Sequence, residues 1–258
     1  MELLLTVNRE RYKTIVDSSL LAGKIMLENG AETSRVEDTM ERIICKAMGE
    51  PYCSSSYTYV TVNGIFVTIG QDNTNFVRID TRDQNLEKVT RVNQISRSFA
   101  SDELTIEDVY TELQIVDKEP MDYSLAFKII CTSILSGSVM FIMGGKPVDL
   151  PATMIAGVIC YVTYLLGLKF LKTPFIVEYV AAFVGGMAAL FINNWFGSHL
   201  SSVMIGTVAP LVPGIAITNA IRDIMAKHYI SGSIRGLEAI FIAGAIGTGI
   251  ATVYYLFF

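Results

Sequence analysis

The sequence predicts a bundle of five transmembrane helices preceded by a soluble α+β domain of two helices, a three-stranded antiparallel sheet and two further helices. Two observations carry this prediction. Residues 1–123 hold 21 Asp or Glu and 13 Lys or Arg, whereas residues 124–258 hold only 4 and 7. The second part also contains five apolar stretches of 18–22 residues, the length that an α-helix needs to cross about 30 Å of hydrocarbon.

Composition excludes several classes of protein. Four Cys and two His make neither a disulfide-rich scaffold nor a Cys/His zinc site, so we expect no metal and no cofactor. A net charge of -5 and a pI near 5.1 argue against a nucleic-acid partner. No catalytic residue is assigned, because the common nucleophile, phosphate and metalloprotease motifs are missing from the sequence. Cys45 and Cys53 lack a neighbouring base and are expected to be inert thiols.

The soluble domain, residues 1–120, is expected to begin with two helices. Residues 9–29 place apolar side chains at three- and four-residue spacing, and Asn29-Gly30 would end this helix in a left-handed cap. The pattern Ser34-x-x-Glu37 is typical of a capping box and would open the second helix.

A sheet and two more helices complete this domain. Strands are expected over 57–62, 65–69 and 76–80. Asn63-Gly64 between the first two predicts a type I′ hairpin turn, and residues 71–73 predict a second turn. Amphipathic helices are expected at about 84–100 and 105–117, the last one capped by Thr105.

The membrane domain, residues 121–258, is expected to hold five spans. They are predicted over about 124–143, 151–168, 174–193, 201–221 and 237–258. The alternative, a water-soluble core of buried helices, fails because five helices that are apolar on all sides leave no polar surface.

Loop charges predict the orientation of these spans. With the soluble domain inside, the inside loops carry five Lys or Arg and the outside loops carry one. The inside residues are Lys169, Lys172, Arg222, Lys227 and Arg235, and the outside residue is Lys146. Because cytoplasmic loops carry an excess of basic residues, we expect a cytoplasmic N-terminal domain and an outer C-terminus at a bacterial inner membrane.

The fourth span contains the most informative motif. Pro210, Pro213 and Gly214 lie near its middle, where they should break the helix. Broken backbone at this depth is tolerated only where protein buries it or a water-filled cavity meets it, and transporters use it to hold substrates and ions. A simple packing kink is the alternative.

Polar residues follow the break. Asn219 and Arg222 could engage a substrate carboxylate, and Asp223 could neutralise Arg222 or accept an amino group. The alternative is that these side chains reach the cytoplasmic interface. Within the third span, Glu178 is a candidate for ion coupling, together with Asp223. A plain ion pair of Glu178 with Lys128 is the alternative, because charge inside a span usually faces a cavity or a partner.

A polar motif also lies at the first interhelical turn of the soluble domain. Its residues are Gly30, Glu32, Thr33, Arg35 and Glu37. Paired carboxylates can do acid–base work, but such charges more often cap and solvate the start of a helix.

Two stretches together resemble the bacterial threonine/serine exporter family, specifically its N-terminal part. The first runs from Asn29-Gly30-Ala31-Glu32-Thr33-Ser34-Arg35 to Met40. The second runs from Pro210-Leu-Val-Pro213-Gly214 through Asn219-Ala-Ile-Arg222-Asp223 to Ser231-Gly232, Arg235 and Glu238-Ala239. The resemblance covers essentially the whole chain.

The resemblance implies ion-driven export of small amino acids (threonine, serine) or carboxylic acids across the inner membrane. Single-chain members have about twice as many spans, whereas split members pair a five-span subunit with a smaller all-membrane partner, and one split relative is linked to succinate export. This chain is similar to the larger split subunit. A membrane-anchored hydrolase-like enzyme and a regulatory or scaffold subunit stay open as alternatives, as does a homo-oligomer.

Overall fold

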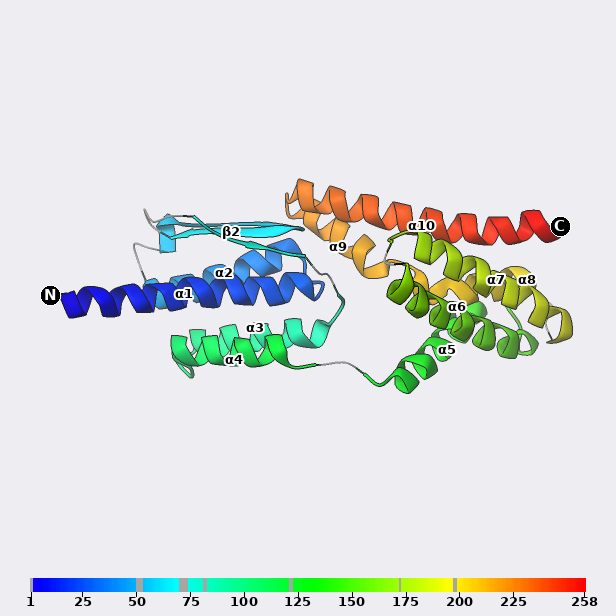
Figure 1. Ribbon diagram of the computed structural model, residues 1–258, viewed down its shortest axis with the longest axis horizontal. Helices are drawn as coiled ribbons and strands as arrows, with labels where there is room; N and C mark the ends of the chain where they lie inside the picture. The colour runs from blue at the N-terminus through cyan, green and yellow to red at the C-terminus, as the bar shows by residue number, and fades with distance from the viewer. Residues whose placement is uncertain are drawn as a thin grey trace. The chain divides into compact units, whose positions relative to one another are not determined.

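The computed structural model describes residues 2–49, 53–69, 74–80, 83–120, 123–171, 173–196 and 199–258. The chain divides into two compact units (Figure 1). The N-terminal unit comprises Met1–Met121 with Ile217–Gly236, and the membrane unit comprises Asp122–Ala216 with Leu237–Phe258. The N-terminal unit therefore includes parts of two helices that come late in the sequence.

The N-terminal unit opens with helices α1 (Glu2–Glu28) and α2 (Thr33–Met48). Gly30 has a φ of +90°, a left-handed conformation that glycine adopts at little cost. The Gly30 amide donates to Leu27 O at 3.4 Å, and the Ala31 amide donates to Met26 O at 3.0 Å. These two bonds form the Schellman motif, so the predicted cap at Asn29-Gly30 is confirmed.

The predicted capping box at Ser34 and Glu37 is wrong. Helix α2 begins at Thr33, and its N-cap residue, Glu32, makes no side-chain cap bond. Asp223 instead accepts the bond from the Thr33 amide, while the Glu37 carboxylate accepts one from the Val60 amide at 3.1 Å. Tertiary partners thus replace the local cap.

Three antiparallel strands form the sheet in the order β1 (Ser56–Thr61), β2 (Gly64–Ile69), β3 (Asn75–Arg78). The strands are confirmed to within one or two residues, but the turn is not. Thr61 pairs with Gly64, so Val62 and Asn63 form the loop, and neither Asn63 nor Gly64 has positive φ. The Phe76 ring fills the space above Gly64, where a Cβ would lie 2.5 Å from Cε2. The second predicted turn, 71–73, lies outside the described residues.

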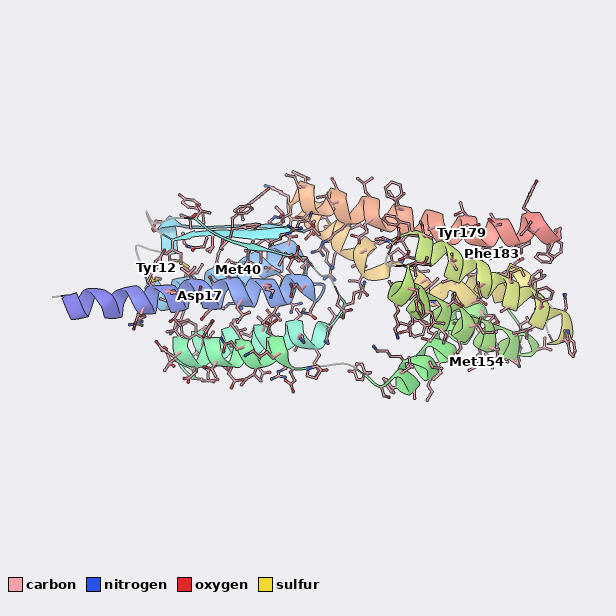
Figure 2. The ribbon with its side chains drawn as sticks, in the orientation of Figure 1. Tyr12, Asp17, Met40, Met154, Tyr179 and Phe183 are labelled. Atoms are coloured by element: carbon pink, nitrogen blue, oxygen red, sulfur yellow. A yellow bond between two sulfur atoms is a disulfide. The ribbon has the colours of Figure 1, made fainter. Side chains whose placement is uncertain are left out.

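Helices α3 (Leu86–Ala100) and α4 (Ile106–Lys118) complete the N-terminal unit. Thr105 caps α4 as predicted, in a reciprocal capping box with Asp108. Helix α1 lies between the sheet and the α3–α4 pair (Figure 1). Its apolar face and those of α2, α3, α4 and β2 share one buried core, which includes Met40 (Figure 2). Burial of apolar surface holds this unit together.

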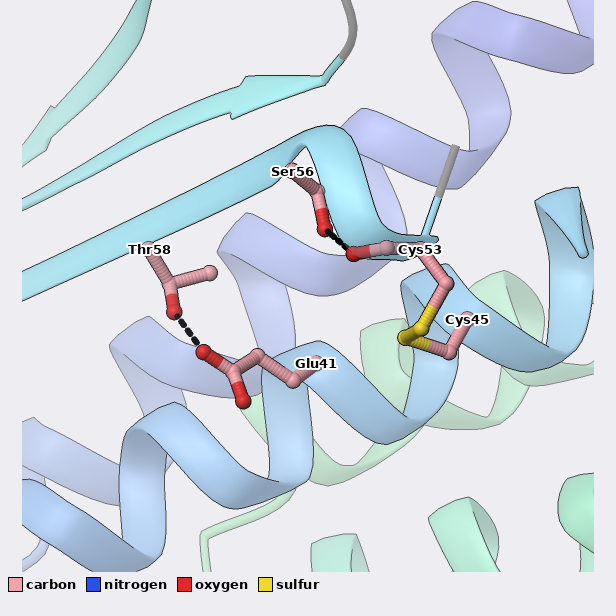
Figure 3. The surroundings of a disulfide bond; sticks show 5 residues. All are labelled: Glu41, Cys45, Cys53, Ser56 and Thr58. Carbon is pink, nitrogen blue, oxygen red and sulfur yellow. Dashed lines mark hydrogen bonds between the residues drawn. A yellow bond between two sulfur atoms is a disulfide. The ribbon is translucent and has the colours of Figure 1, made fainter. Parts of the chain in front are cut away.

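A disulfide joins Cys45 in α2 to Cys53, which begins the short 3-10 helix η1 (Cys53–Ser55). The expectation of two inert thiols is therefore wrong, because the chain folds back after α2 and brings these cysteines to a Cα–Cα distance of 4.5 Å. Nearby, Thr58 Oγ1 donates to Glu41 at 2.8 Å (Figure 3). Both contacts tie the start of β1 to α2.

The membrane unit is built from apolar helices, the last two of which it shares with the N-terminal unit. They are α5 (Leu125–Ile142), α6 (Leu150–Phe170), α7 (Ile176–Phe196), α8 (Leu200–Val208), α9 (Gly214–Met225) and α10 (Tyr229–Phe257). Within the described residues, four helices are long and apolar enough to cross a membrane, and five spans result if the bent pair α8–α9 counts as one. This confirms the predicted fold class. Helix α10 starts before the predicted residue 237, because Tyr229–Gly236 belongs to the N-terminal unit.

The disulfide indicates an oxidising compartment for the N-terminal unit, whereas the predicted orientation places this unit in the cytoplasm. Disulfides persist in oxidising compartments, whereas the cytosol keeps thiols reduced. Because the loop charges predict that this unit lies inside, we expect Cys45 and Cys53 to be free thiols in growing cells and to pair after extraction.

The measurement is acid quenching of whole cells followed by labelling with a maleimide–polyethylene glycol and a gel shift. Replacing Cys131 and Cys160 by Ser leaves only the two bridge residues to be labelled. If the protein is labelled only after a reductant is added, the two cysteines are paired in the cell. The N-terminal unit would then face the oxidising side, and the predicted orientation would be wrong.

Candidate functional site

The two stretches of sequence that carry polar motifs meet inside the N-terminal unit. The turn between α1 and α2 offers two carbonyl oxygens to the α9–α10 region. Asn219 Nδ2 donates to Gly30 O at 2.8 Å, and Arg235 Nη2 donates to Ala31 O at 2.9 Å. We call this group of residues, Gly30–Glu37 with Asn219, Arg222, Asp223, His228 and Arg235, the anchor cluster.

Asp223 is the centre of the anchor cluster and is fully buried. Its Oδ1 accepts the Thr33 amide at 2.8 Å, and its Oδ2 accepts the Thr33 hydroxyl at 3.0 Å. Arg235 Nε lies 3.4 Å from the same Oδ2. The carboxylate thus sits at the N-terminus of α2, where helix amides favour negative charge. A buried charge needs such partners to offset its lost hydration.

The turn between α9 and α10 repeats the geometry of the α1–α2 turn. Lys227 has a φ of +68°, its amide donates to Ile224 O at 3.0 Å, and the His228 amide donates to Asp223 O at 2.8 Å. This is a second Schellman motif. It reverses the chain so that Arg235 returns beside Asp223.

Two weaker contacts complete the cluster. Arg222 Nη1 lies 3.5 Å from Glu32 Oε2, and the Arg222 side chain is 60% exposed, so this pair contributes little. His228 Nε2 lies 3.4 Å from Glu37 Oε2. The predicted neutralisation of Arg222 by Asp223 is not seen: Asp223 pairs with Arg235, which the sequence did not single out as its partner.

Burial raises the pKa of the Glu37 carboxyl above its ordinary value of 4.5. The bond from the Val60 amide and the His228 ring oppose this increase, and the negative charges of Glu41 and Asp223 add to it. Glu37 therefore holds a proton more readily in the folded protein than in the unfolded chain.

Four of the five residues in the soluble-domain motif make contacts outside their own helix that hold the anchor cluster together. Gly30, Glu32, Thr33 and Glu37 make the contacts given above. Arg35 is exposed, and its carbonyl oxygen accepts a bond from Thr39 within α2. Burial and bonding of this kind favour a structural role over acid–base catalysis.

The predicted helix break is present in the membrane unit. Helix α8 ends at Val208, the 3-10 helix η3 covers Ala209–Leu211, and α9 starts at Gly214. The axes of the two segments differ by 64°. Val212 is extended, with φ and ψ of −62° and 126°. Pro210 and Pro213 each remove a backbone donor here, so the break follows from the sequence.

Glu178 lies in the first turn of α7 and is only 8% exposed. Its Oε2 is buried and has no hydrogen-bond partner among the described residues. The alternative of an ion pair with Lys128 therefore leaves this oxygen unexplained. One residue along the helix, the Tyr179 hydroxyl lies 3.2 Å from that of Thr252.

Comparison with known protein families finds one family that matches almost the whole chain. The family described as "Putative threonine/serine exporter" (ThrE) matches residues 17–257. The chain belongs to this exporter family. No curated protein and no solved structure matches it.

Family membership agrees with the geometry. An exporter needs a multi-pass membrane part, which α5–α10 provide, and a small-molecule substrate rather than a reaction of its own. Among the described residues, no group of three or more His, Cys, Asp or Glu could hold a metal ion. The match spans both the anchor cluster and the helix break.

The first prediction from the site concerns Asp223. We expect Asp223→Asn to destabilise the anchor cluster by about 3–5 kcal/mol, because it removes the buried negative charge beside Arg235. Hydrogen–deuterium exchange of the full chain in detergent should then be faster by about a hundredfold or more in residues 29–40 and 219–235.

Two controls accompany this variant. Arg222→Gln removes an exposed partner and should cost less than about 1 kcal/mol. The double replacement Asp223→Leu with Arg235→Met removes both buried charges and should recover part of the protection, because the Thr33 amide and the Ala31 carbonyl still lose their partners. Equal exchange in Asp223→Asn and the wild type would show that this ion pair does not hold the cluster.

A second prediction concerns pH. A group whose folded pKa is raised contributes stability that is complete below its unfolded pKa and is lost as pH rises through its folded pKa. Ionised Glu37 therefore destabilises the fold at neutral pH. We expect Glu37→Gln to unfold at a higher temperature than the wild type at pH 8, and the difference to vanish as pH falls toward 4.5.

The readout is the thermal midpoint of the full chain in detergent across this pH range. Asp38→Asn is the matched control, because Asp38 also lies in α2 and is exposed; its midpoint should follow the wild type at each pH. A Glu37→Gln midpoint that stays below the wild type at pH 8 would contradict the sign of the shift.

Proposed function

We propose that this exporter-family chain is the larger subunit of a two-part secondary exporter for small amino acids or dicarboxylates. The observation that supports it is the helix break between α8 and α9, inside an otherwise continuous apolar pair. A broken helix frees backbone groups in the membrane interior, where they can hold a substrate.

The proposed mechanism is alternating access around Pro210, Pro213 and Gly214. Asn219 and Arg222 engage the leaving substrate, and Glu178 or Asp223 couples an ion gradient to transport. Asn219 and Asp223 bond to Gly30 and Thr33. We therefore assign the Gly30–Glu37 segment a gating role: its bonds must open before these side chains can reach a substrate.

The proposed location is a bacterial inner membrane, with the N-terminal unit in the cytoplasm and the C-terminus outside. The excess of basic residues in the loops expected inside supports this orientation. An exporter needs its first contact with substrate on this side.

The proposed partner is a smaller, all-membrane subunit. It rests on the resemblance to split exporters, because this chain has at most five spans among its described residues. Threonine, serine and succinate are the substrates to be tested.

The deciding experiment is efflux of preloaded, labelled serine, threonine and succinate from cells that express the chain alone or with the smaller subunit. We expect efflux of at least one of the three only when both subunits are present. Pro213→Ala with Gly214→Ala should slow efflux, because a continuous helix at this point removes the freed backbone groups.

Asn193→Ala is the control variant, because Asn193 lies in α7 and is buried like Glu178 but is not part of the proposed pathway. Absence of efflux of all three compounds, with both subunits detected in the membrane, would reject the exporter proposal. It would favour a scaffold role or, if residues 1–120 turned over a substrate, an enzyme.

A further inference from the structure

Two of the residues predicted to bind substrate are occupied by a segment of the same chain. Asn219 Nδ2 donates to Gly30 O at 2.8 Å, and both carboxylate oxygens of Asp223 accept bonds from Thr33. Asn219 is 8% exposed, and Asp223 and Thr33 are fully buried. A free substrate can therefore reach Asp223 only after the turn between α1 and α2 has left it.

The contact between Thr33 and Asp223 has the chemistry of a bound β-hydroxy amino acid. The Thr33 amide donates to Oδ1 of Asp223 at 2.8 Å, and the Thr33 hydroxyl donates to Oδ2 at 3.0 Å. Free threonine carries its ammonium and hydroxyl groups on the same two neighbouring carbons, so it can offer both donors to one carboxylate. Because its ammonium group is charged, free threonine makes the stronger bond of the two.

The side chains that hold the turn are charged, although the turn itself is neutral. Arg235 is 7% exposed; its Nη2 donates to Ala31 O at 2.9 Å, and its Nε lies 3.4 Å from Asp223 Oδ2. Burial of two charges has a high desolvation cost, and a neutral hydroxyl or amide side chain is enough to cap a helix start. A free amino acid, in contrast, carries a charge opposite to each of these two side chains.

Resting on the proposed export function, we propose that the α1–α2 turn, residues 30–33, is an autoinhibitory self-ligand. Thr33 occupies the Asp223 carboxylate and keeps the chain closed until a free hydroxy-amino acid displaces it. Displacement also separates Gly30 from Asn219 and Ala31 from Arg235. These two side chains are then free to donate to a carboxylate.

Self-inhibition of this kind sets a threshold for opening. A tethered segment competes with a free ligand as if it were present at a concentration on the order of millimolar. The apparent affinity of the free ligand falls with the fraction of molecules that are open. Opening therefore follows accumulation of the free amino acid. The Thr33 hydroxyl adjusts the threshold, because one bond to a charged group changes an equilibrium constant about tenfold or more.

The test is hydrogen–deuterium exchange of the full chain in lipid nanodiscs during a titration with L-threonine. We expect saturating threonine to speed exchange in residues 29–40 about tenfold or more, because this segment loses its partners. Residues 219–235 should stay as protected as before, because the ligand replaces the turn. A cap with a purely structural role predicts no response to threonine in either segment.

L-valine is the control ligand, because it has the shape of threonine without the hydroxyl group. A site that binds a hydroxyl discriminates against the analogue that lacks it. We expect valine to need a concentration about tenfold or more higher than threonine to give the same exchange in residues 29–40.

Thr33→Val separates self-inhibition from folding. In cells with both subunits, it should lower the internal threonine concentration for half-maximal efflux about tenfold or more, whereas loss of a purely structural contact would slow efflux. Thr33→Ser keeps both donors and should follow the wild type. Thr39→Val is the matched control, because Thr39 is also buried in α2 but its hydroxyl contacts Arg35 O and Asn93 instead of Asp223. It should leave the half-maximal concentration unchanged.

Three results would overturn the self-ligand: exchange in residues 29–40 that does not respond to threonine, valine that opens the chain as well as threonine, or a Thr33→Val variant that needs as much threonine as the wild type. Efflux by the wild type together with the first result would leave the exporter proposal standing without self-inhibition. Opening by threonine with no efflux under any condition would leave the self-ligand standing without transport.

Discussion

The buried carboxylate of Asp223 is the interaction on which the N-terminal unit depends. It joins a loop near the start of the chain to a helix 190 residues later, through both the amide and the hydroxyl of Thr33. Without it, the first turn of α2 would lose the acceptor of the Thr33 amide, and Arg235 would lose the negative charge 3.4 Å from its Nε. The two Schellman turns bring Thr33 and Arg235 to this carboxylate, because each turn reverses the chain close to it.

Most of the fold could be predicted because its causes are local. Apolar periodicity located α1 to α4, Thr105 capped α4 through its own neighbour Asp108, and two prolines with a glycine broke the fourth span where they stand. Length and apolar composition alone identified the spans. In each case the residues that decide the structure lie within one or two turns of each other.

The incorrect predictions depend instead on contacts between residues that are far apart in the sequence. Ser34 and Glu37 have the spacing of a capping box, but Asp223 and Val60 compete for the same groups from distant parts of the chain. Asn63-Gly64 has the composition of a type I′ turn, but the ring of Phe76 on β3 needs Gly64 within the strand. The Cys45–Cys53 bridge and the Asp223–Arg235 pair likewise depend on how the chain folds back. Spacing in the sequence cannot show such competition.

The contrast between Asp223 and Glu178 separates structure from function. Both are buried carboxylates close to a helix N-terminus, and a buried charge is tolerated only when other groups offset its lost hydration. Asp223 receives two hydrogen bonds and an arginine from the protein itself. Glu178 has an oxygen to which no described residue donates. A carboxylate that the protein satisfies with its own donors stabilises the fold, whereas the unbonded oxygen of Glu178 makes this residue the better candidate for the proposed ion-coupling role.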